Sequence, residues 1–316
     1  MKNNQRHFRP QNSTADNTKQ TPCFHSNQIK IQKMSTPAVI DLNKARRDLG
    51  DGPLRFANKD ERSVQDQITA LSTEERACLD KLKSKWEEQH PDKPFSDWMY
   101  LRFARCSPGT KKFNYSASWK VMNKFDRKYL TLTASDLEKQ LLSKTLFPLP
   151  GLKSADGHDM FYMKPARYFP KQTSTKDIIE NLGYVMGTVL EKEKACTEGI
   201  GFLAYMDDWH MDNFSIDYCF QFMMMLQGRV PARVRLFLIV NPPGWFAKIW
   251  AIMRPMLARD FRKKVHIVKE DQVGEFLMPN PGPYLPDDMT TGQANTDELV
   301  QDYVKYREYV EGQLSD

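Results

Sequence analysis

The densest group of side chains able to do chemistry is the run from Asp207 to Asp212, which follows an apolar stretch typical of a strand. Carboxylates and an imidazole are competent ligands for a divalent metal. One hypothesis is therefore a metal-dependent hydrolase that uses Asp207, Asp208, His210 and Asp212. The alternative is a polar loop between a strand and a helix, in which Asp212 or Asn213 caps the helix. We favour the loop, because acidic residues are common in turns and no second histidine lies nearby.

Other sequence signatures of catalysis are missing. The chain has neither a glycine-rich phosphate loop with its lysine nor a dinucleotide fingerprint after any strand, and it has no Gly-x-Ser-x-Gly elbow. The cysteines are odd in number and far apart, which predicts reduced, unlinked thiols; they are Cys23, Cys78, Cys106, Cys196 and Cys219. We therefore expect no enzyme activity, no cofactor and no metal.

A second segment with functional character runs from Trp245 to Leu257. An apolar stripe at helical spacing here consists of Trp245, Ile249, Met253 and Met256, broadened by Trp250 and Leu257 and flanked by Lys248, Arg254 and Arg259. Rings beside cations suit a helix that enters a lipid interface, where the rings lie under the headgroups and the bases face phosphates. The alternative is a helix that covers a core and carries solvated charges.

Charge is distributed unevenly along the chain, although the net charge is only +6. Residues 229–269 contain ten lysines and arginines against one acid, Asp260, whereas residues from 270 onwards contain eleven acids and two bases. One cationic region on an otherwise balanced protein predicts a local anionic partner, either phosphates or an anionic membrane, and not nucleic acid.

The elements that position these residues change character near residue 149. We expect a mostly disordered polar tail over 1–62, a helical region over 63–148, an α/β domain over 149–292 and an acidic helix over 293–316. Capping residues and periodicity predict helices at 73–89, 97–106, 115–129, 136–143 and 296–313. Short apolar runs predict strands at 160–163, 200–206, 234–240 and 265–268, with helices around Ile178 to Val189 and Ile216 to Met224 between them. Alternating apolar strands and helices predict a largely parallel sheet covered by helices.

The order of several motifs resembles the CRAL-TRIO (Sec14-like) family over about Thr73 to Thr291. Leu101-Arg102-Phe103-Ala104-Arg105 is similar to the Leu-Arg-x-x-Arg helix of that family, and Lys112-Phe113-Asn114 to the turn after it. Val230-Pro231-Ala232-Arg233 resembles the Tyr-Pro-Glu-Arg turn. Asn241-Pro242-Pro243 onward to Lys264 and Val268 resembles the gate helix with the strand behind it, and Leu285-Pro286-Asp287-Asp288 the closing loop.

The resemblance implies a parallel sheet floored by helices and a hydrophobic pocket closed by a movable amphipathic gate helix. It implies that the chain binds one hydrophobic ligand, with a phospholipid favoured, and exchanges or presents it at membranes. Expected pocket-lining residues are Phe202, Tyr205, Phe220, Met223, Met224, Phe237 and Ile239. Expected gate and membrane residues are Trp245, Phe246, Ile249, Trp250, Met253, Lys248 and Arg254.

The resemblance also implies a headgroup site at Lys264, together with Arg105 or Lys112. Members that bind phosphatidylinositol pair this lysine with a glutamate, and Ala232 stands at the glutamate position. Phosphatidylinositol in the standard pose is therefore not expected. A membrane-recruitment adaptor with a fixed lipid remains the alternative function.

Two segments that the sequence lacks, a membrane helix and a signal peptide, bear on where the protein is located in the cell. No apolar run approaches the roughly 20 residues of a membrane helix, and the first residues contain no continuous apolar stretch of a signal peptide. We therefore expect a cytoplasmic protein that associates peripherally with membranes.

Overall fold

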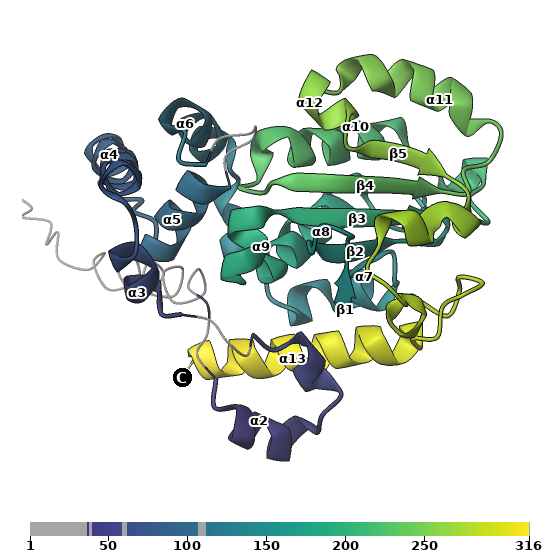
Figure 1. Cartoon of the computed structure of the whole chain (residues 1–316), viewed down its shortest axis with the longest axis horizontal. Helices are drawn as coiled ribbons and strands as arrows, with labels where there is room; N and C mark the ends of the chain where they lie inside the picture. Colours follow the sequence, from purple (N-terminus) through teal and green to yellow (C-terminus); the bar gives the residue numbers. More distant parts are fainter. Residues whose placement is uncertain (1–36, 38–39, 59–61, 107–111, 316) are drawn as a thin grey trace, which may run out of the picture.

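The computed structural model describes residue 37 and residues 40–58, 62–106 and 112–315. An N-terminal helical region lies at one end of a five-stranded α/β body (Figure 1). Most of the tail and the insertion at Ser107 to Thr110 lie outside the described residues. Among those described, no helix combines the length and the apolar character needed to span a bilayer.

The helical region consists of α3 (Val64–Thr69), α4 (Thr73–Gln89), α5 (Asp97–Arg105) and α6 (Tyr115–Lys124). The helix predicted at 73–89 is confirmed as α4, and it begins with a capping box: the Ser72 side chain accepts from the Glu75 N–H, and the Glu75 carboxylate accepts from the Ser72 N–H at 3.0 Å. Helix α6 ends earlier than predicted and is followed by a 3₁₀ turn, η2 (Arg127–Leu130). The predicted helix at 136–143 is a 3₁₀ turn, η3 (Ser135–Leu137), that leads into α7 (Glu138–Leu142).

The sheet has the order β1-β2-β3-β4-β5, which is also the order in the chain. The strands are β1 (Leu146–Lys153), β2 (Asp159–Met163), β3 (Ile200–Tyr205), β4 (Val234–Val240) and β5 (Val265–Val268). Strand β1 pairs antiparallel with β2, and the remaining pairs are parallel. The predicted fold class, a helical region followed by a largely parallel sheet with helices, is confirmed.

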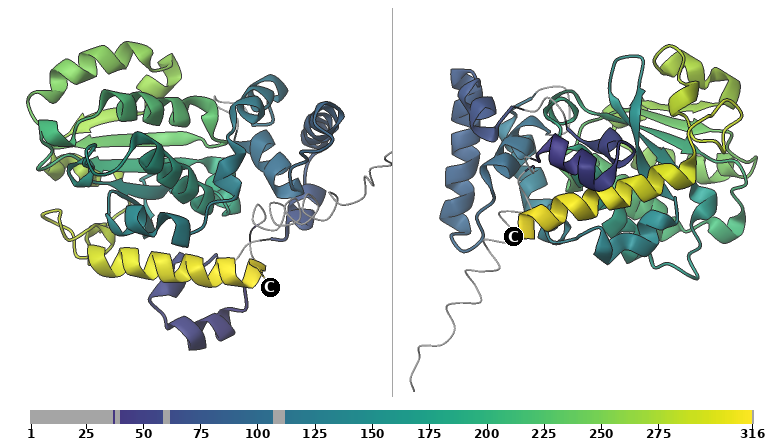
Figure 2. Two further views of the ribbon diagram at one scale, coloured as in Figure 1. Left: turned by 180° about the vertical axis from the view of Figure 1, so that it is seen from behind. Right: turned by 90° about the horizontal axis from the view of Figure 1, so that it is seen from below.

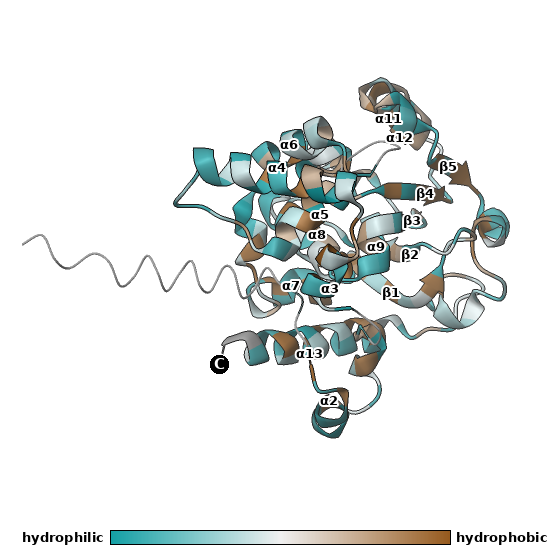
Figure 3. Ribbon diagram, turned by 60° about the vertical axis from the view of Figure 1, so that its left-hand side comes forward, coloured by the Kyte–Doolittle hydropathy of each residue, from teal (hydrophilic) through white to brown (hydrophobic). Residues whose placement is uncertain are grey.

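Each parallel connection contains helices: α8 (Thr175–Val189) and α9 (Glu193–Glu198), then α10 (Ile216–Met224), then α11 (Phe246–Met253) and α12 (Arg259–Arg262). Because strand crossovers are right-handed and the strand order runs one way, these helices gather on one face of the sheet. Figure 2 (left), seen from behind, brings that face forward. Figure 3 shows that β4 and β5 are largely hydrophobic; β4 is buried apart from Arg235, whereas β5 is a partly exposed edge strand.

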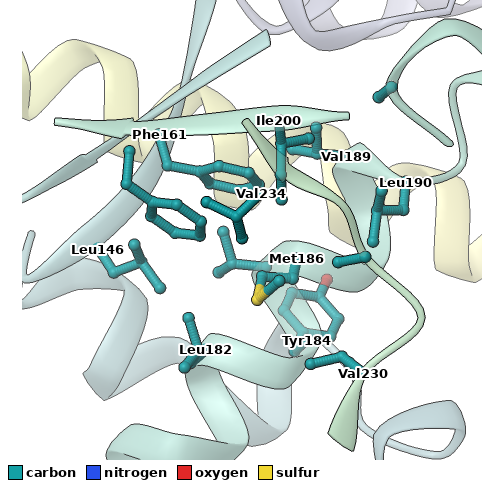
Figure 4. Close-up of a cluster of buried hydrophobic side chains, with 14 of the residues drawn as sticks. Leu146, Phe161, Leu182, Tyr184, Met186, Val189, Leu190, Ile200, Val230 and Val234 are labelled. Carbon is teal, nitrogen blue, oxygen red and sulfur yellow. The ribbon is translucent and has the colours of Figure 1, made fainter. Parts of the chain in front are cut away.

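The core on this face joins α8 to the sheet. Figure 4 shows Leu182, Met186 and Val189 of α8 meeting Phe161 and Ile200 of the strands, and all five are buried. The core continues along α10, where the Phe222 ring lies 6.2 Å from Phe202 and 5.9 Å from Phe237. The sheet is thus supported at its β1 end by α8, which leaves the β4 and β5 end for α11.

Two expectations about the chain's organisation are wrong. The tail predicted over 1–62 contains α2 (Leu42–Leu49), capped by Asp41, and the 3₁₀ turn η1 (Pro53–Phe56) with buried Leu54 and Phe56. The boundary placed near residue 148 falls inside β1, which contains Pro148 and Pro150. Prolines are tolerated there because β1 is an edge strand, and its register with β2 shifts between Leu149 and Lys153, where Gly151 has φ +86°.

The helical region is joined to the α/β body through its buried arginines and a pair of thiols. Arg233 Nε donates to the Arg105 carbonyl at 2.8 Å, and the Sγ atoms of Cys106 and Cys196 lie 3.1 Å apart. Both thiols are free and buried. Cysteines that the sequence separates by ninety positions therefore meet at the junction of the two regions.

Candidate lipid-binding site

A cavity lies between α10, α11 and the sheet, directly behind the segment predicted to be the gate. It extends from Met163 and Met206 at the carboxyl ends of β2 and β3 to Val265 at the start of β5. The lining carries no charged side chain; it consists of Met163, Pro165, Tyr168, Ala204, Met206, Trp209, Asn213, Ser215, Tyr218, Cys219, Phe222, Met223, Leu226, Phe237, Ile239, Phe246, Trp250, Met253, Leu257, Phe261 and Val265.

The free volume of the cavity is about 80 Å³. This is room for several water molecules, but it is far below the roughly 300–1,000 Å³ of pockets that hold drug-sized ligands. A lipid chain could therefore enter only if one wall moved. Helix α11 is the wall that faces outward (Figure 1).

The cavity-facing residues of α11 are Phe246, Trp250 and Met253, and Leu257 lines the cavity just after the 3₁₀ turn η7 (Arg254–Met256). The opposite side presents Ile252 and Met256 to solvent, with exposed fractions of 60% and 46%. The predicted stripe of Trp245, Ile249, Met253 and Met256 is therefore rotated relative to the observed one, and of its four members only Met253 lines the cavity. The Trp245 ring instead packs at a tilt against the Trp209 ring, with ring centroids 4.6 Å apart.

Helix α11 is held by apolar contacts. In the described part of the chain, the backbone N–H groups of residues 243–257 donate to carbonyls of the same segment, for example Phe246 N–H to the Pro243 carbonyl at 2.9 Å. Bonds to other described parts of the chain occur at its ends, from the Asn241 N–H to the Val268 carbonyl and from the Ala258 N–H to Gln227 Oε1. Apolar contacts are non-directional, so the attachment of this helix to the body does not depend on specific hydrogen bonds along its length.

The structure places three of the seven expected lining residues, Met223, Phe237 and Ile239, in the cavity wall. Phe202 is fully buried between Phe161 and Phe237, and Tyr205 donates to Glu270 at 2.9 Å beyond the cavity. Phe220 is 40% exposed and Met224 is half-buried, because the inward face of α10 is formed by Tyr218, Cys219, Phe222 and Met223.

A second hollow of about 260 Å³ adjoins the cavity and contains the predicted headgroup lysine. Lys264 lines it together with Arg233, Ala232 and Asp260, and the two spaces share Leu226 and Phe261. Burial lowers the pKa of Lys264 from its ordinary value of 10.5, and the neighbouring Arg235 and Arg233 lower it further. An anion placed in this hollow would relieve that repulsion.

The other two predicted headgroup cations do not line this hollow. Arg105 is buried in the helical region, where it donates to Gln67 Oε1 and lies 3.3 Å from Glu193. Lys112 is exposed at the start of the turn before α6. The contacts of Arg105 are therefore to protein groups outside the hollow. Arg233, which sequence reasoning did not assign to the site, lines the hollow together with Lys264.

The loop from Asp207 to Asp212 connects β3 to α10. Among the described residues, no three His, Cys, Asp or Glu side chains come together in a way that could hold a metal ion. Asp208 has φ +59°, and Asn213 donates to the carbonyls of Ala166 (2.9 Å) and Tyr168 (3.1 Å), which fixes the loop. The cap of α10 is Ser215, which replaces the predicted Asp212 or Asn213.

Sequence reasoning missed the wall formed by Tyr168, Trp209, Tyr218 and Phe222. Tyr168 and Trp209 lie in loops without periodicity, so no pattern marked them. Tyr218 and Phe222 are four residues apart on α10 and could have been found by testing the second apolar face of that helix.

Comparison with known proteins agrees with this architecture. Residues 143–289 match the model of the CRAL/TRIO domain. Tyrosine-protein phosphatase non-receptor type 9 of Mus musculus is 24% identical over 212 residues, which cover 58% of this chain and 36% of the relative. The protein of the same name from Homo sapiens is 23% identical over 219 residues, covering 66% of this chain and 36% of the relative. This chain thus spans about a third of the length of these relatives. The crystal structure of Sfh5 aligns with a TM-score of 0.42 at 9% identity, covering 94% of this chain and 98% of that one.

Proposed function

The chain belongs to the CRAL/TRIO family through residues 143–289, and on that premise we propose that it binds a phospholipid in the cavity behind α11 and exchanges it at membranes. The family binds hydrophobic small molecules such as lipids and is generally non-enzymatic. The observation that carries the proposal is an uncharged cavity directly beneath a helix whose outer side exposes Ile252 and Met256 among cations.

Transfer of a lipid through water needs such a cavity. Each acyl CH₂ exposed to water costs about 0.8 kcal/mol, so an unshielded two-chain lipid would cost tens of kcal/mol. A protein interior nearly as apolar as the bilayer makes the exchange close to neutral. The rate is then governed by opening of the cavity, a step that a mobile wall can control.

The outer side of α11 and the residues after it suit an anionic membrane. Ile252 and Met256 are the exposed apolar groups, and the exposed cations around them are Lys248, Arg254, Arg259, Arg262 and Lys263. Each base near an anionic surface contributes about 1 kcal/mol, which gives weak and reversible association. When α11 tilts into the membrane, Phe246 and Trp250 leave the cavity and an acyl chain takes their place.

The lipid headgroup belongs in the hollow beside Lys264. Leu226 and Phe261 line both the hollow and the cavity, so a lipid that occupies both would have to displace these two side chains. Lys264 and Arg233 supply positive charge for a phosphate. Ala232 lines the hollow without offering a carboxylate to inositol hydroxyls, so phosphatidylinositol in the family's standard pose is disfavoured.

The test is transfer of a fluorescent phosphatidylcholine from donor to acceptor vesicles that contain phosphatidylserine. We expect the double variant Ile252→Asp, Met256→Asp to slow transfer at least tenfold, because two carboxylates must leave water and face like charges. Both residues are exposed, so the fold is expected to remain intact. The matched control is Leu142→Asp on α7, which is 40% exposed and should transfer like the wild type.

Unchanged transfer by the folded double variant would remove α11 from the mechanism. Association of the wild type with vesicles without any transfer of lipid would instead support the adaptor with a fixed lipid.

A further inference from the structure

Cys106 and Cys196 meet where the helical region joins the α/β body. Cys106 is the C-cap of α5, Cys196 lies on α9, and these two helices are in contact. The Cys106 Sγ lies 3.1 Å from the Cys196 Sγ and 3.0 Å from the Cys196 carbonyl oxygen. Both thiols are free, and neither lines the lipid cavity. A close pair of thiols has a chemistry that isolated thiols lack, because one sulfur can attack the other once that sulfur has been oxidised.

The two sulfurs are almost close enough to be bonded. A disulfide bond is about 2.05 Å long, so bond formation requires the sulfurs of Cys106 and Cys196 to approach by only about 1 Å. A movement of this size is comparable to the thermal displacements of atoms in folded proteins. The bond would join positions that are 90 residues apart in the sequence and that belong to different regions of the molecule.

The surroundings of the pair give the two thiols different roles. Burial raises the pKa of Cys196, but the hydrogen bond from Cys106 lowers it. The charges of the buried Arg102 and Arg105 lower it further, so the pKa of Cys196 lies below its usual value of 9.0. Burial raises the pKa of Cys106, which therefore keeps its proton. Because the thiolate is the nucleophilic form of cysteine, Cys196 reacts first with an oxidant.

Both thiol side chains are fully covered, so an oxidant reaches them only when α5 and α9 separate. An ion pair at this contact joins Arg105 Nη2 to the Glu193 carboxylate at 3.3 Å, and Glu193 lies in the first turn of α9. Local openings of such contacts occur in native proteins, and hydrogen peroxide is small enough to enter through them. Oxidation is therefore slower than at an exposed thiol, and the same cover protects the product from reductants until the junction opens again.

We propose that Cys106 and Cys196 are a site of reversible oxidation by hydroperoxides, at which a disulfide fixes the helical region to the α/β body. The Cys196 thiolate attacks one peroxide oxygen, the O–O bond breaks, and the departing hydroxide takes a proton to form water, which leaves Cys196 as a sulfenic acid. Cys106 then loses its proton and attacks the sulfenic sulfur, whose hydroxide leaves with that proton as a second water. Two thiols are thus oxidised to one disulfide, while one hydrogen peroxide is reduced to two waters.

The experiment treats the full chain with hydrogen peroxide in a background where only this pair can form a disulfide, namely Cys23→Ser, Cys78→Ser, Cys219→Ala. We expect the intact mass to fall by two hydrogens and peptide mapping without reductant to recover a linked Cys106–Cys196 peptide. The melting temperature should rise by at least about 5 °C, because the bond closes a loop of 90 residues. Prolonged incubation with dithiothreitol should reverse both changes.

The matched control adds Cys106→Ala to the same background. Cys196 then has no partner, so it should gain oxygen, and the melting temperature should not rise. Adding Cys196→Ala to the background provides a second control, in which Cys106 should stay reduced.

Three results would overturn the proposal. The folded background variant could keep both thiols in excess peroxide, it could form the bond only after unfolding in urea, or the bond could form and leave the melting temperature unchanged.

Discussion

The surroundings of Lys264 determine the pKa of its amino group and make it suited to binding an anion. It lies half-buried beside Arg233 and Arg235, with Asp260 as the acid that opposes their effect on its pKa. Its pKa is lowered mainly by burial, so the amino group loses its proton at a lower pH than an exposed lysine does. Sites for anions in proteins commonly place cations together in this way, because the ligand removes the repulsion.

This environment predicts the pH dependence of anion binding. We expect the affinity for decyl phosphate to fall as pH rises from 8 towards 10, because the protonated amine holds the phosphate and deprotonates before 10.5 is reached. Lys264→Gln should lower the affinity at pH 8 about tenfold and remove most of this decline. Titration calorimetry at several pH values measures both effects.

The neighbouring Lys263 provides the control, since it is exposed and does not line the hollow. Lys263→Gln should change the affinity less than twofold. A Lys264→Gln profile that still follows the wild type would place the phosphate elsewhere.

At the scale of elements, the sequence predicted which segments form strands and helices better than it predicted their faces. Strands β4 and β5 have the predicted bounds because short, mainly apolar runs rich in β-branched residues mark strands whether they are buried, as β4 is, or partly exposed, as β5 is. Helix α11 is apolar on several sides, so its periodicity could not choose between Trp245 and Trp250 as the inward residue. The choice depends on where β4 and β5 lie, which is information that the sequence of α11 does not contain.

Strand β1 was missed because its two prolines are compatible only with an edge position, which is a property of the whole sheet.

In the loop after η9 (Gly282–Tyr284), the backbone of Gly292 lies close to the backbone of Pro286 and Leu285. A Cβ at Gly292 would lie 1.7 Å from the Pro286 carbonyl oxygen and 2.9 Å from that of Leu285, so the backbones must move apart to admit it. We expect Gly292→Ala to lower the free energy of unfolding by more than about 2 kcal/mol in urea denaturation. Gly274→Ala in η8 (Glu270–Phe276), where nothing lies within 4 Å of the added atom, should change it by less than about 1 kcal/mol. Equal stability of the two variants would contradict the close approach.

At the scale of the whole molecule, α13 (Thr296–Ser315) joins parts of the chain that are far apart in sequence. Arg307 is buried and bonds the Glu191 carboxylate through both guanidinium nitrogens, at 3.0 and 3.2 Å, and lies 3.5 Å from Glu311. Arg55 of η1 contacts Glu298 and Asp302 at 2.6 and 2.7 Å. The sequence predicted the helix but not these partners, because ion pairs between distant positions leave no local pattern.

Removing the central cation tests this arrangement. Arg307→Met removes the cation that faces the Glu191 and Glu311 carboxylates in a largely buried setting, so we expect a loss of about 3–5 kcal/mol in the free energy of unfolding. Lys305→Met on the exposed side of the same helix should cost less than about 0.5 kcal/mol. Urea denaturation followed by circular dichroism measures both, and a small loss for Arg307→Met would show that α13 docks through its apolar face alone.

The pairing of η1 with α13 has a consequence for how the chain reaches its native state during synthesis. Leu54 and Phe56 are buried, and the Phe56 ring lies 5.2 Å from that of Tyr303, an aromatic neighbour that is synthesised only after the whole α/β body. Until Tyr303 has been synthesised, the side of Phe56 that it covers stays exposed, which makes this side a natural target for chaperones that recognise nascent chains.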